Sequence, residues 1–269
     1  MAVITKITTQ QKNQDRFNIF MDYGQGEKFA FSVDSDVLIK FQLKKGMELE
    51  NFALMEIHYQ DDIRKAYNLA VSYLARRMRA VKELKDYLMQ KDIEEPVIQE
   101  VVHKLSMQNY LNDEQFALAY TRTQINTTDK GPELIRMELK EKGINQGIIE
   151  ISLEEFSFEQ RRDKAIKLCE KSLQKGLKES DRAVKQKIEQ LLIRKGFTYD
   201  VIQYALSEIK DDQDRDELEA VRFQGEKLHR KYSHLTGFEY KQKMKQALYR
   251  KGFSIDLIEQ FLAKKIEKS

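Results

Sequence analysis

Hydrophobic positions follow two different periods along this chain. Up to about residue 60 they alternate with polar positions, which is typical of strands that are buried on one face. From Asp61 onward they recur three and four residues apart, which is typical of amphipathic helices. The change of period predicts a small β-rich module at residues 1–60, followed by a mainly helical region.

Three alternating segments and a glycine-containing turn organise the β-rich module: residues 3–8, 16–22 and 28–33, with Gly24 and Gly26 before the last. They predict a three-stranded meander with a hairpin between its second and third strands. Asp34 or Ser35 can cap a short helix that reaches Phe41, and Gly46 would end that segment. Residues 47–59 alternate again and predict a further strand.

Within the helical region one short string recurs four times. Each copy has two apolar residues four apart, a lysine three residues later, a glycine or aspartate, and a final apolar residue. The copies begin at Leu84, Ile135, Ile188 and Met244, and their lysines are 51, 53 and 56 residues apart. A nearly constant period predicts one supersecondary unit that is used four times.

Each unit is predicted to contain three helices, of which the second carries the string. First helices are expected near residues 61–77, 112–126, 159–176 and 214–232. The glycine falls just past the second helix, where a left-handed residue ends a helix and the preceding lysine suits the negative end of the dipole. The third helix repeats an isoleucine at a fixed distance from the string, at Ile98, Ile149, Ile202 and Ile258.

The predicted fold class is mainly α: an elongated tandem array of three-helix repeats with a small N-terminal β-rich module. A unit of about 50 residues buries only a small core, so neighbouring units are expected to stack side by side. The predicted domains are residues 1–60 for the β-rich module, then 61–110, 111–158, 159–212 and 213–269 for the four repeats.

Composition and charge fit a soluble protein with a large exposed surface. Charged residues make up 34% of the chain, and no apolar stretch approaches the ~20 residues that cross a bilayer. The start of the chain lacks an apolar segment of signal-peptide length, so a cytoplasmic protein is expected. The net charge is +3, but residues 161–210 hold 13 Lys/Arg against 7 Asp/Glu. This basic field favours polyanions or acidic protein surfaces, although lysine-rich faces also simply solvate helices.

Candidate catalytic and metal-binding chemistry is sparse. The turn with Gly24 and Gly26 lacks the helix and Lys-Ser or Lys-Thr of a phosphate-binding loop. His229 and His234 are five residues apart, which does not suit two ligands on one helix face. The single cysteine, Cys169, has the helical spacing of a core residue and no base nearby. No nucleophile–base pair is found, so we expect neither an enzyme nor a cofactor or metal.

Basic residues are the better candidates for function. Arginine offers a planar fork for carboxylate or phosphate groups. Candidates lie between the first two helices of repeat one, in repeat two, and at the strings of repeats three and four: Arg76, Arg77, Arg79, Lys82, Arg122, Arg136, Arg194, Lys195, Arg250 and Lys251. The first group can alternatively pair with Glu83 and Asp86, and the last four can simply complement helix C-termini.

Three blocks of sequence resemble the RecX family of regulatory proteins. The blocks are Arg76-Arg77-x-Arg79 with Glu83-Leu84; Tyr110-Leu111-Asn112-Asp113 with Phe116-Ala117 and Tyr120; and Lys130-Gly131-Pro132 with Ile135, Glu138-Leu139 and Lys142-Gly143-Ile144. One position departs from the family pattern, because Ala80 stands where a capping serine is usual. Alanine cannot accept a capping hydrogen bond, so a shifted or frayed helix start is expected there.

The resemblance implies a modular protein that binds the RecA nucleoprotein filament in DNA recombination, DNA repair and the SOS response. It implies occupancy of the filament groove, with inhibition of ATP hydrolysis, strand exchange or filament growth. We also expect a monomer, with a possible secondary contact to single- or double-stranded DNA.

Two other functions fit the repeats. Three-helix units with a short glycine turn are similar in outline to helix-turn-helix proteins, so direct DNA binding through a basic surface is the alternative. Against it, the third helices share no set of base-reading side chains, and residues 145–156 are acidic. A general helical scaffold that binds an unrelated peptide is the third interpretation.

Overall fold

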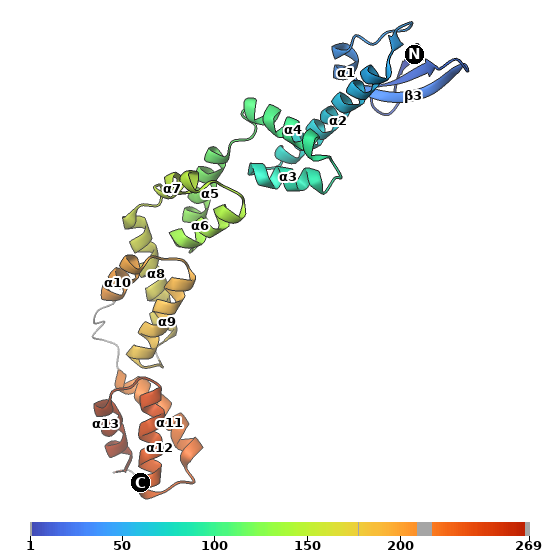
Figure 1. The fold of residues 1–269 in the computed structure, drawn as a ribbon. Coiled ribbons are helices and arrows are strands. Elements are labelled where there is room, and N and C mark those ends of the chain that lie inside the picture. Colours follow the sequence, from blue (N-terminus) through green and yellow to red (C-terminus); the bar gives the residue numbers. More distant parts are fainter. Residues whose placement is uncertain (1, 177, 209–216, 267–269) are drawn as a thin grey trace. The chain divides into compact units, whose positions relative to one another are not determined.

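The computed structural model describes residues 2–176, 178–208 and 217–266 (Figure 1). Within these ranges there are thirteen helices and a small N-terminal antiparallel sheet. The mainly α fold class with tandem three-helix repeats and an N-terminal β-rich module is therefore confirmed. The chain forms two compact units, Met1–Phe116 with Lys142–Ile144, and Ala117–Glu141 with Asn145–Ser269.

The predicted meander is present in the N-terminal module. Its strands are β1 (Ala2–Thr9), β2 (Arg16–Asp22), β3 (Glu27–Asp34) and the two-residue β4 (Glu48–Leu49), in the sheet order β3-β2-β1-β4. The turn after β2 is held by the Asp22 carboxylate, whose Oδ1 accepts from the amides of Gly24 (2.7 Å) and Gly26 (2.9 Å). The turn amides thus bind a side chain of the chain itself. Helix α1 (Ser35–Lys40) follows β3, capped by Asp34 as predicted.

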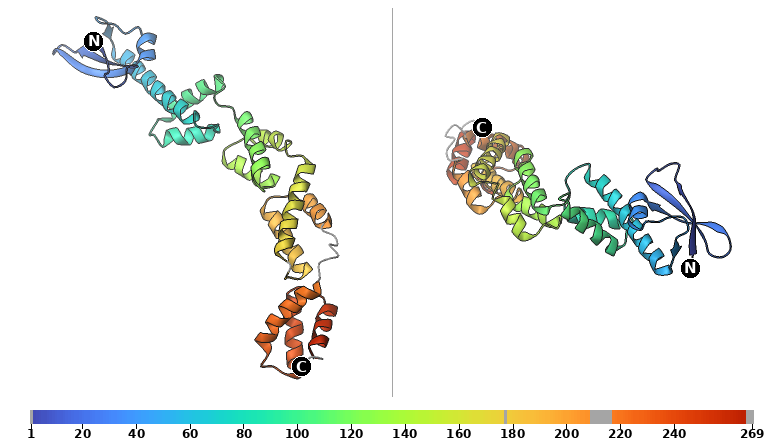
Figure 2. Two further views of the ribbon diagram at one scale, coloured as in Figure 1. Left: turned by 180° about the vertical axis from the view of Figure 1, so that it is seen from behind. Right: turned by 90° about the horizontal axis from the view of Figure 1, so that it is seen from above.

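The further strand predicted over residues 47–59 is wrong. Only Glu48 and Leu49 pair with β1, and helix α2 begins at Asn51 and runs to Leu74. The positions that face the sheet follow a helical spacing: Ile57 is fully buried in its core, Ala53 and Leu54 pack against that core, and Met55 is 70% exposed. Helix α2 therefore serves both the sheet and the first three-helix group, and Figures 1 and 2 show it leaving the sheet to join α3 and α4.

The remaining helices form four groups of three. They are α2 with α3 (Val81–Met89) and α4 (Glu95–Met107); α5 (Asp113–Thr127), α6 (Pro132–Glu141) and α7 (Gln146–Leu153); α8 (Phe158–Lys175), α9 (Asp181–Arg194) and α10 (Tyr199–Glu208); and α11 (Glu217–Tyr232), α12 (Gly237–Arg250) and α13 (Ile255–Ile266). The predicted boundary 212/213 lies outside the described residues, and α2 crosses 60/61 without interruption. The proposed division into domains stays a prediction.

The recurring string is the core of each group. Both apolar residues of every copy are fully buried: Leu84, Leu88, Ile135, Leu139, Ile188, Leu192, Met244 and Leu248. The third-helix isoleucines are at most 2% exposed: Ile98, Ile149, Ile202 and Ile258. The following residue is left-handed as predicted, with φ of +80° at Gly143 and Gly196 and +58° at Asp92. The apolar residue after it folds back: the Phe197 amide donates to the Leu192 carbonyl at 3.1 Å.

The glycine of the string has a second role that the sequence spacing did not reveal: it contacts the preceding group of helices. A Cβ on Gly143 would lie 2.8 Å from the Lys82 stem at the start of α3. A Cβ on Gly252 would lie 2.6 Å from Ser180 Oγ at the start of α9. The end of α6 therefore approaches the start of α3, and the end of α12 approaches the start of α9, too closely for a side chain on the glycine.

The contact between the second and third groups is made by backbone. The Gly131 amide donates to the Lys195 carbonyl at 2.6 Å, and the Glu133 amide donates to the Gly196 carbonyl at 3.0 Å. A Cβ on Gly131 or on Gly196 would overlap the facing backbone. Free carbonyls at the end of α9 thus satisfy free amides at the start of α6, and the two helix dipoles meet with opposite signs.

Helix α8 completes this contact by capping the other two helices of the second group. Lys164 Nζ donates to the Ile125 carbonyl, in the last turn of α5, and at 2.7 Å to the Thr128 carbonyl just beyond that helix. Arg161 donates to the Leu153 carbonyl at 3.2 Å at the end of α7. Burial lowers the pKa of both cations. All three helices of the second group therefore have one end satisfied by the third group.

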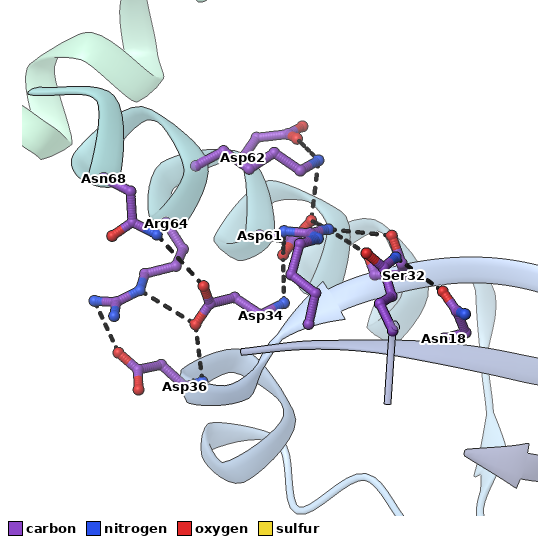
Figure 3. A network of polar contacts seen from close by, with 11 residues as sticks. Asn18, Ser32, Asp34, Asp36, Asp61, Asp62, Arg64 and Asn68 are labelled. Carbon is purple, nitrogen blue, oxygen red and sulfur yellow. Dashed lines mark hydrogen bonds and ion pairs between the residues drawn. The ribbon is translucent and has the colours of Figure 1, made fainter. Parts of the chain in front are cut away.

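A different chemistry joins the sheet to α2 (Figure 3). The Asp61 carboxylate is 2% exposed and accepts from Arg16 Nη2 at 2.9 Å and from the Asp34 amide at 2.8 Å, with Lys65 Nζ also at 2.9 Å. The Asp34 carboxylate caps α1 and also pairs with Arg64 Nε at 3.2 Å. This network of charged groups connects β2, β3, α1 and α2.

Candidate partner-binding surface

The first four candidate cations lie in and beside the link between α2 and α3. Arg76 is exposed and forms no ion pair with a residue that the structure describes. Arg77 binds Glu83, with 2.8 Å between Nη2 and Oε1, so the predicted alternative of internal pairing holds for it. Arg79 is half-buried, and its guanidinium lies 4.1 Å from the centre of the Tyr73 ring. Lys82 is the second residue of α3, and its stem lies against Gly143.

The start of α3 is neither shifted nor frayed, although Ala80 cannot cap it. Glu83 Oε2 accepts from the Ala80 amide at 3.1 Å, and Asp113 Oδ1 accepts from the Val81 amide at 2.9 Å. Asp113 opens α5, so the following repeat supplies the missing cap. Ala80 itself is fully buried and belongs to the packed start of α3.

Opposite electrostatic effects act on these two carboxylates. Burial tends to raise the pKa of Glu83, but the hydrogen bonds from Arg77 and from the Ala80 amide outweigh burial, so its pKa is lowered. Burial raises the pKa of Asp113, and the Val81 amide compensates only in part. Glu83 also lies 3.6 Å from Lys142 Nζ, so its charge is shared between two cations at this surface.

Both candidates of the second repeat are engaged within the chain. Arg122 makes two hydrogen bonds to Glu155, from Nε at 3.0 Å and from Nη2 at 2.8 Å, and this contact raises the pKa of Arg122. Arg136 pairs with Glu133 at 3.1 Å and with Glu150. Glu150 of the third helix, Glu155 just beyond it and Glu133 of the second helix thus neutralise the two arginines that were predicted to face a partner.

The last four candidates occupy equivalent places at the ends of α9 and α12. Arg194 and Arg250 are exposed and form no ion pair with a described residue. The carbonyls of Lys195 and Lys251 bind the preceding repeat, Lys251 through Ser180 Oγ at 2.5 Å. The ten candidates are therefore not gathered in one place. Arg76, Arg79, Arg194 and Arg250 are the arginines among them that no described carboxylate neutralises.

Sequence reasoning missed the tyrosines beside the first arginine group. Tyr73 and Tyr87 stack with ring centres 4.0 Å apart and planes 3° apart, and Arg79 lies against this pair. No functional role was predicted for Tyr73 or Tyr87 from the sequence. The position of Tyr73 six residues before an arginine was the available signal, but only the turn after α2 brings the two side chains together.

The side chains considered for catalysis or metal binding lie in surroundings that do not favour either role. Cys169 is fully buried, and burial raises the pKa of its thiol to about 11, so it is not a thiolate at neutral pH. Nowhere in the described ranges do three His, Cys, Asp or Glu side chains gather in a way that could hold a metal ion. Among the described helices, none combines the length and apolarity needed to cross a bilayer.

Fold and repeats define a helical-repeat protein whose exposed cations lie on several repeats. Comparison with family models makes the assignment specific: the RecX N-terminal domain matches residues 2–50, the first three-helix domain 66–105 and the second 112–153. The third three-helix domain matches twice, at residues 159–206 and 215–262. The chain belongs to the RecX family of regulatory proteins.

Relatives agree over the whole length. The chain is 48% identical over 263 residues to the regulatory protein RecX of Bacillus subtilis (strain 168), covering 97% of this chain and 98% of that protein. It is 46% identical over 269 residues to the RecX of Bacillus cytotoxicus, covering both chains completely. A crystal structure of regulatory protein RecX matches with a TM-score of 0.68 at 35% identity, over 76% of this chain and 98% of that one. The RecX of Lactobacillus salivarius matches with a TM-score of 0.54 at 39% identity, over 56% and 97%.

Proposed function

We propose that this protein binds the RecA nucleoprotein filament and inhibits its ATP hydrolysis, strand exchange and filament growth by occupancy. Membership of a family of regulatory proteins over the full length of the chain carries this proposal. The repeats support it physically, because exposed arginines recur at the same place in consecutive repeats, at Arg194 and Arg250. Several modest contacts in series suit a partner that itself repeats.

The protein acts in this proposal without catalysis, as a monomer in the cytoplasm, and any contact with DNA is secondary. The alternative of direct DNA binding has less support from the structure. A nucleic-acid backbone needs a row of unneutralised cations. The second repeat interrupts such a row, because Arg122 and Arg136 pair with Glu155 and Glu150.

Co-sedimentation with RecA–single-stranded-DNA filaments, with the same DNA alone as control, tests the proposal. We expect the protein to pellet with the filament and to slow RecA-dependent ATP hydrolysis. Pelleting with bare DNA at an equal or higher affinity, with a steep loss in salt, would instead support the alternative. Absence of the protein from both pellets would contradict both functions.

A charge-matched comparison tests the predicted basic surface. Combined Arg77→Ala and Arg79→Ala substitutions are predicted to weaken filament binding while the repeats stay folded. Because Arg77 also holds Glu83, the combination of Arg76→Ala and Arg79→Ala is the cleaner variant. Lys44→Ala with Lys45→Ala removes the same charge from two exposed positions of the N-terminal module and serves as control. Equal weakening by the control would show that only the net charge matters.

A further inference from the structure

The stacked tyrosines of the first repeat form the middle of a column with a cation at its end. Tyr73 lies in the last turn of α2 and Tyr87 lies in α3, and both side chains are half-buried. Their rings lie 4.0 Å apart with planes 3° apart, which leaves no room for a group between them. Since the Arg79 guanidinium is 4.1 Å from the Tyr73 ring centre, it must lie on the outer face of Tyr73.

The cation strengthens this stacking. Parallel rings present electron-rich faces to each other, so aromatic pairs avoid full overlap and prefer an offset stack. A guanidinium on the outer face draws on the same electron density and offsets that repulsion. Lys91 Nζ lies 5.8 Å from the centre of the Tyr87 ring and adds a second cation to the group. Arginine and tyrosines therefore fix one another in position.

Within this column the terminal nitrogens of the Arg79 guanidinium stay available for a partner. Its Nε is buried without a hydrogen-bond partner, and its terminal nitrogens make no hydrogen bond to a described residue. Stacking alone therefore holds this guanidinium. Arg77 differs, because its guanidinium is neutralised by Glu83, and Arg76 differs because nothing described orients it.

We infer that Tyr73 and Tyr87 are positioning residues that hold Arg79 ready for a carboxylate on the surface of a protein partner. This inference rests on the proposed function, in which that partner is the RecA filament. An arginine that is already ordered loses less side-chain entropy when it binds, so it contributes more affinity than a free one. A discrete carboxylate fits better than a run of phosphates, because the neighbouring Arg77 is already neutralised by Glu83.

The first test needs no partner. Nitrogen-15 relaxation of the Arg79 Nε–H group should show an ordered side chain in the unchanged protein and in Tyr73→Phe, which keeps the ring. The same group should be mobile in Tyr73→Leu. A mobile Arg79 in the unchanged protein would overturn the inference, whatever the outcome of any binding experiment.

The second test measures affinity for RecA–single-stranded-DNA filaments. Tyr73→Leu and Arg79→Lys, which keeps the charge but not the planar stack, should each weaken binding about tenfold, the size expected for a partly desolvated cation–π contact. Tyr73→Leu should add nothing further when Arg79 is already alanine, because the tyrosine acts through the arginine. Additive losses would overturn the positioning role.

Tyr67→Leu is the matched control. Tyr67 is a half-buried tyrosine of the same helix with Lys104 Nζ 4.8 Å from its ring centre, but it does not touch Arg79. It should lower thermal stability about as much as Tyr73→Leu and leave filament binding unchanged; an equal loss of binding would overturn the inference. Equal losses measured on bare single-stranded DNA would overturn the choice of a carboxylate and favour a phosphate. Failure of the unchanged protein to bind the filament would count against the proposed function, while the relaxation test still decides whether the tyrosines order Arg79.

Discussion

Two junctions in this molecule solve the same problem with different chemistry. The sheet is joined to α2 through buried charges, with Asp61 bound by Arg16 and by the Asp34 amide (Figure 3). The second and third repeats are joined through backbone, with Gly131 and Gly196 facing each other. Side-chain charges can join elements of different shape, such as a sheet and a helix. Backbone contact instead pairs the free carbonyls of one helix end with the free amides at the start of another.

The difference also predicts how each junction fails. A buried charge becomes very unfavourable once its partner is removed, and its interactions change with pH. A glycine contact has no titratable group and fails through steric overlap, so it responds to the addition of a single methyl group. Substitutions that separate these two modes of failure follow, from the largest expected effect to the smallest.

Asp61→Ala should be the most destabilising single change, by about 3–5 kcal/mol, because it leaves Arg16 buried without its partner. Arg16 has a side chain that is 16% exposed and depends on Asp61 for its ion pair. Urea unfolding monitored by circular dichroism measures the loss. Asp62→Ala, on the neighbouring exposed residue that pairs with Lys65, is the control and should change stability by less than ~1 kcal/mol. A loss as large in the control would argue against burial as the cause.

Gly196→Ala should cost about 2–4 kcal/mol, of which the left-handed conformation accounts for about 1–2 and overlap with the second repeat for the rest. Gly46→Ala isolates the first part, because Gly46 has φ +84° and nothing within 4 Å of an added Cβ. Gly131→Ala isolates the second, because Gly131 has no left-handed φ but faces Gly196. Hydrogen exchange at the Gly131 and Glu133 amides reports the junction directly. Unchanged protection there in Gly196→Ala would contradict this interpretation.

Ser180→Ala should cost about 1–2 kcal/mol, because its hydroxyl serves two contacts. Ser180 Oγ caps α9 by accepting from the Ala183 amide at 3.3 Å, and it donates to the Lys251 carbonyl of the fourth repeat at 2.5 Å. Ser157→Ala removes only a cap, that of α8, and should cost about 1 kcal/mol. The difference between the two unfolding free energies measures the hydrogen bond between repeats, and equal losses would mean that this bond contributes nothing.

Acidification is the mildest way to perturb the charged junction. Burial tends to raise the pKa of Asp61, but hydrogen bonds from Arg16 and Lys65 outweigh burial, so its pKa is lower in the folded state than in the unfolded state. Its contribution to stability is therefore complete above the unfolded pKa of about 3.9 and is lost as the pH falls through the lower folded value. Unfolding free energies at pH 7 and pH 3 should differ more in the unchanged protein than in Asp61→Asn. An identical pH dependence would show that other carboxylates dominate.

The sequence anticipated those elements whose signals are local. The string that begins at Leu84 and recurs three times predicted the buried pairs, the helix ends and the left-handed residues, because period and cap chemistry act within a few residues. The strand predicted over residues 47–59 failed for the opposite reason. Ile57 packs on the sheet together with Ala53 and Leu54, four and three residues before it, and this helical contact face is set by strands far away in the sequence.

The candidate surface was anticipated in part. Arginines cluster in the sequence at Arg76, Arg77 and Arg79, and the structure keeps them on one link. The pairing of Arg77 with Glu83 was anticipated as an alternative, but more distant partners could not be foreseen: Glu155 pairs with Arg122 across 33 residues and Asp113 caps α3 across 32. Partners so distant in sequence are set by how the helices pack, and no local pattern records them.

By itself the sequence determined that this protein is built from one helical unit used four times behind a small sheet. Hydrophobic period and glycine position decide that within each unit. Only the tertiary structure decided that the same glycines also allow one repeat to rest on the next, and that Tyr73 orients Arg79. Both depend on distances between segments remote along the chain, which steric fit fixes only after the helices have packed.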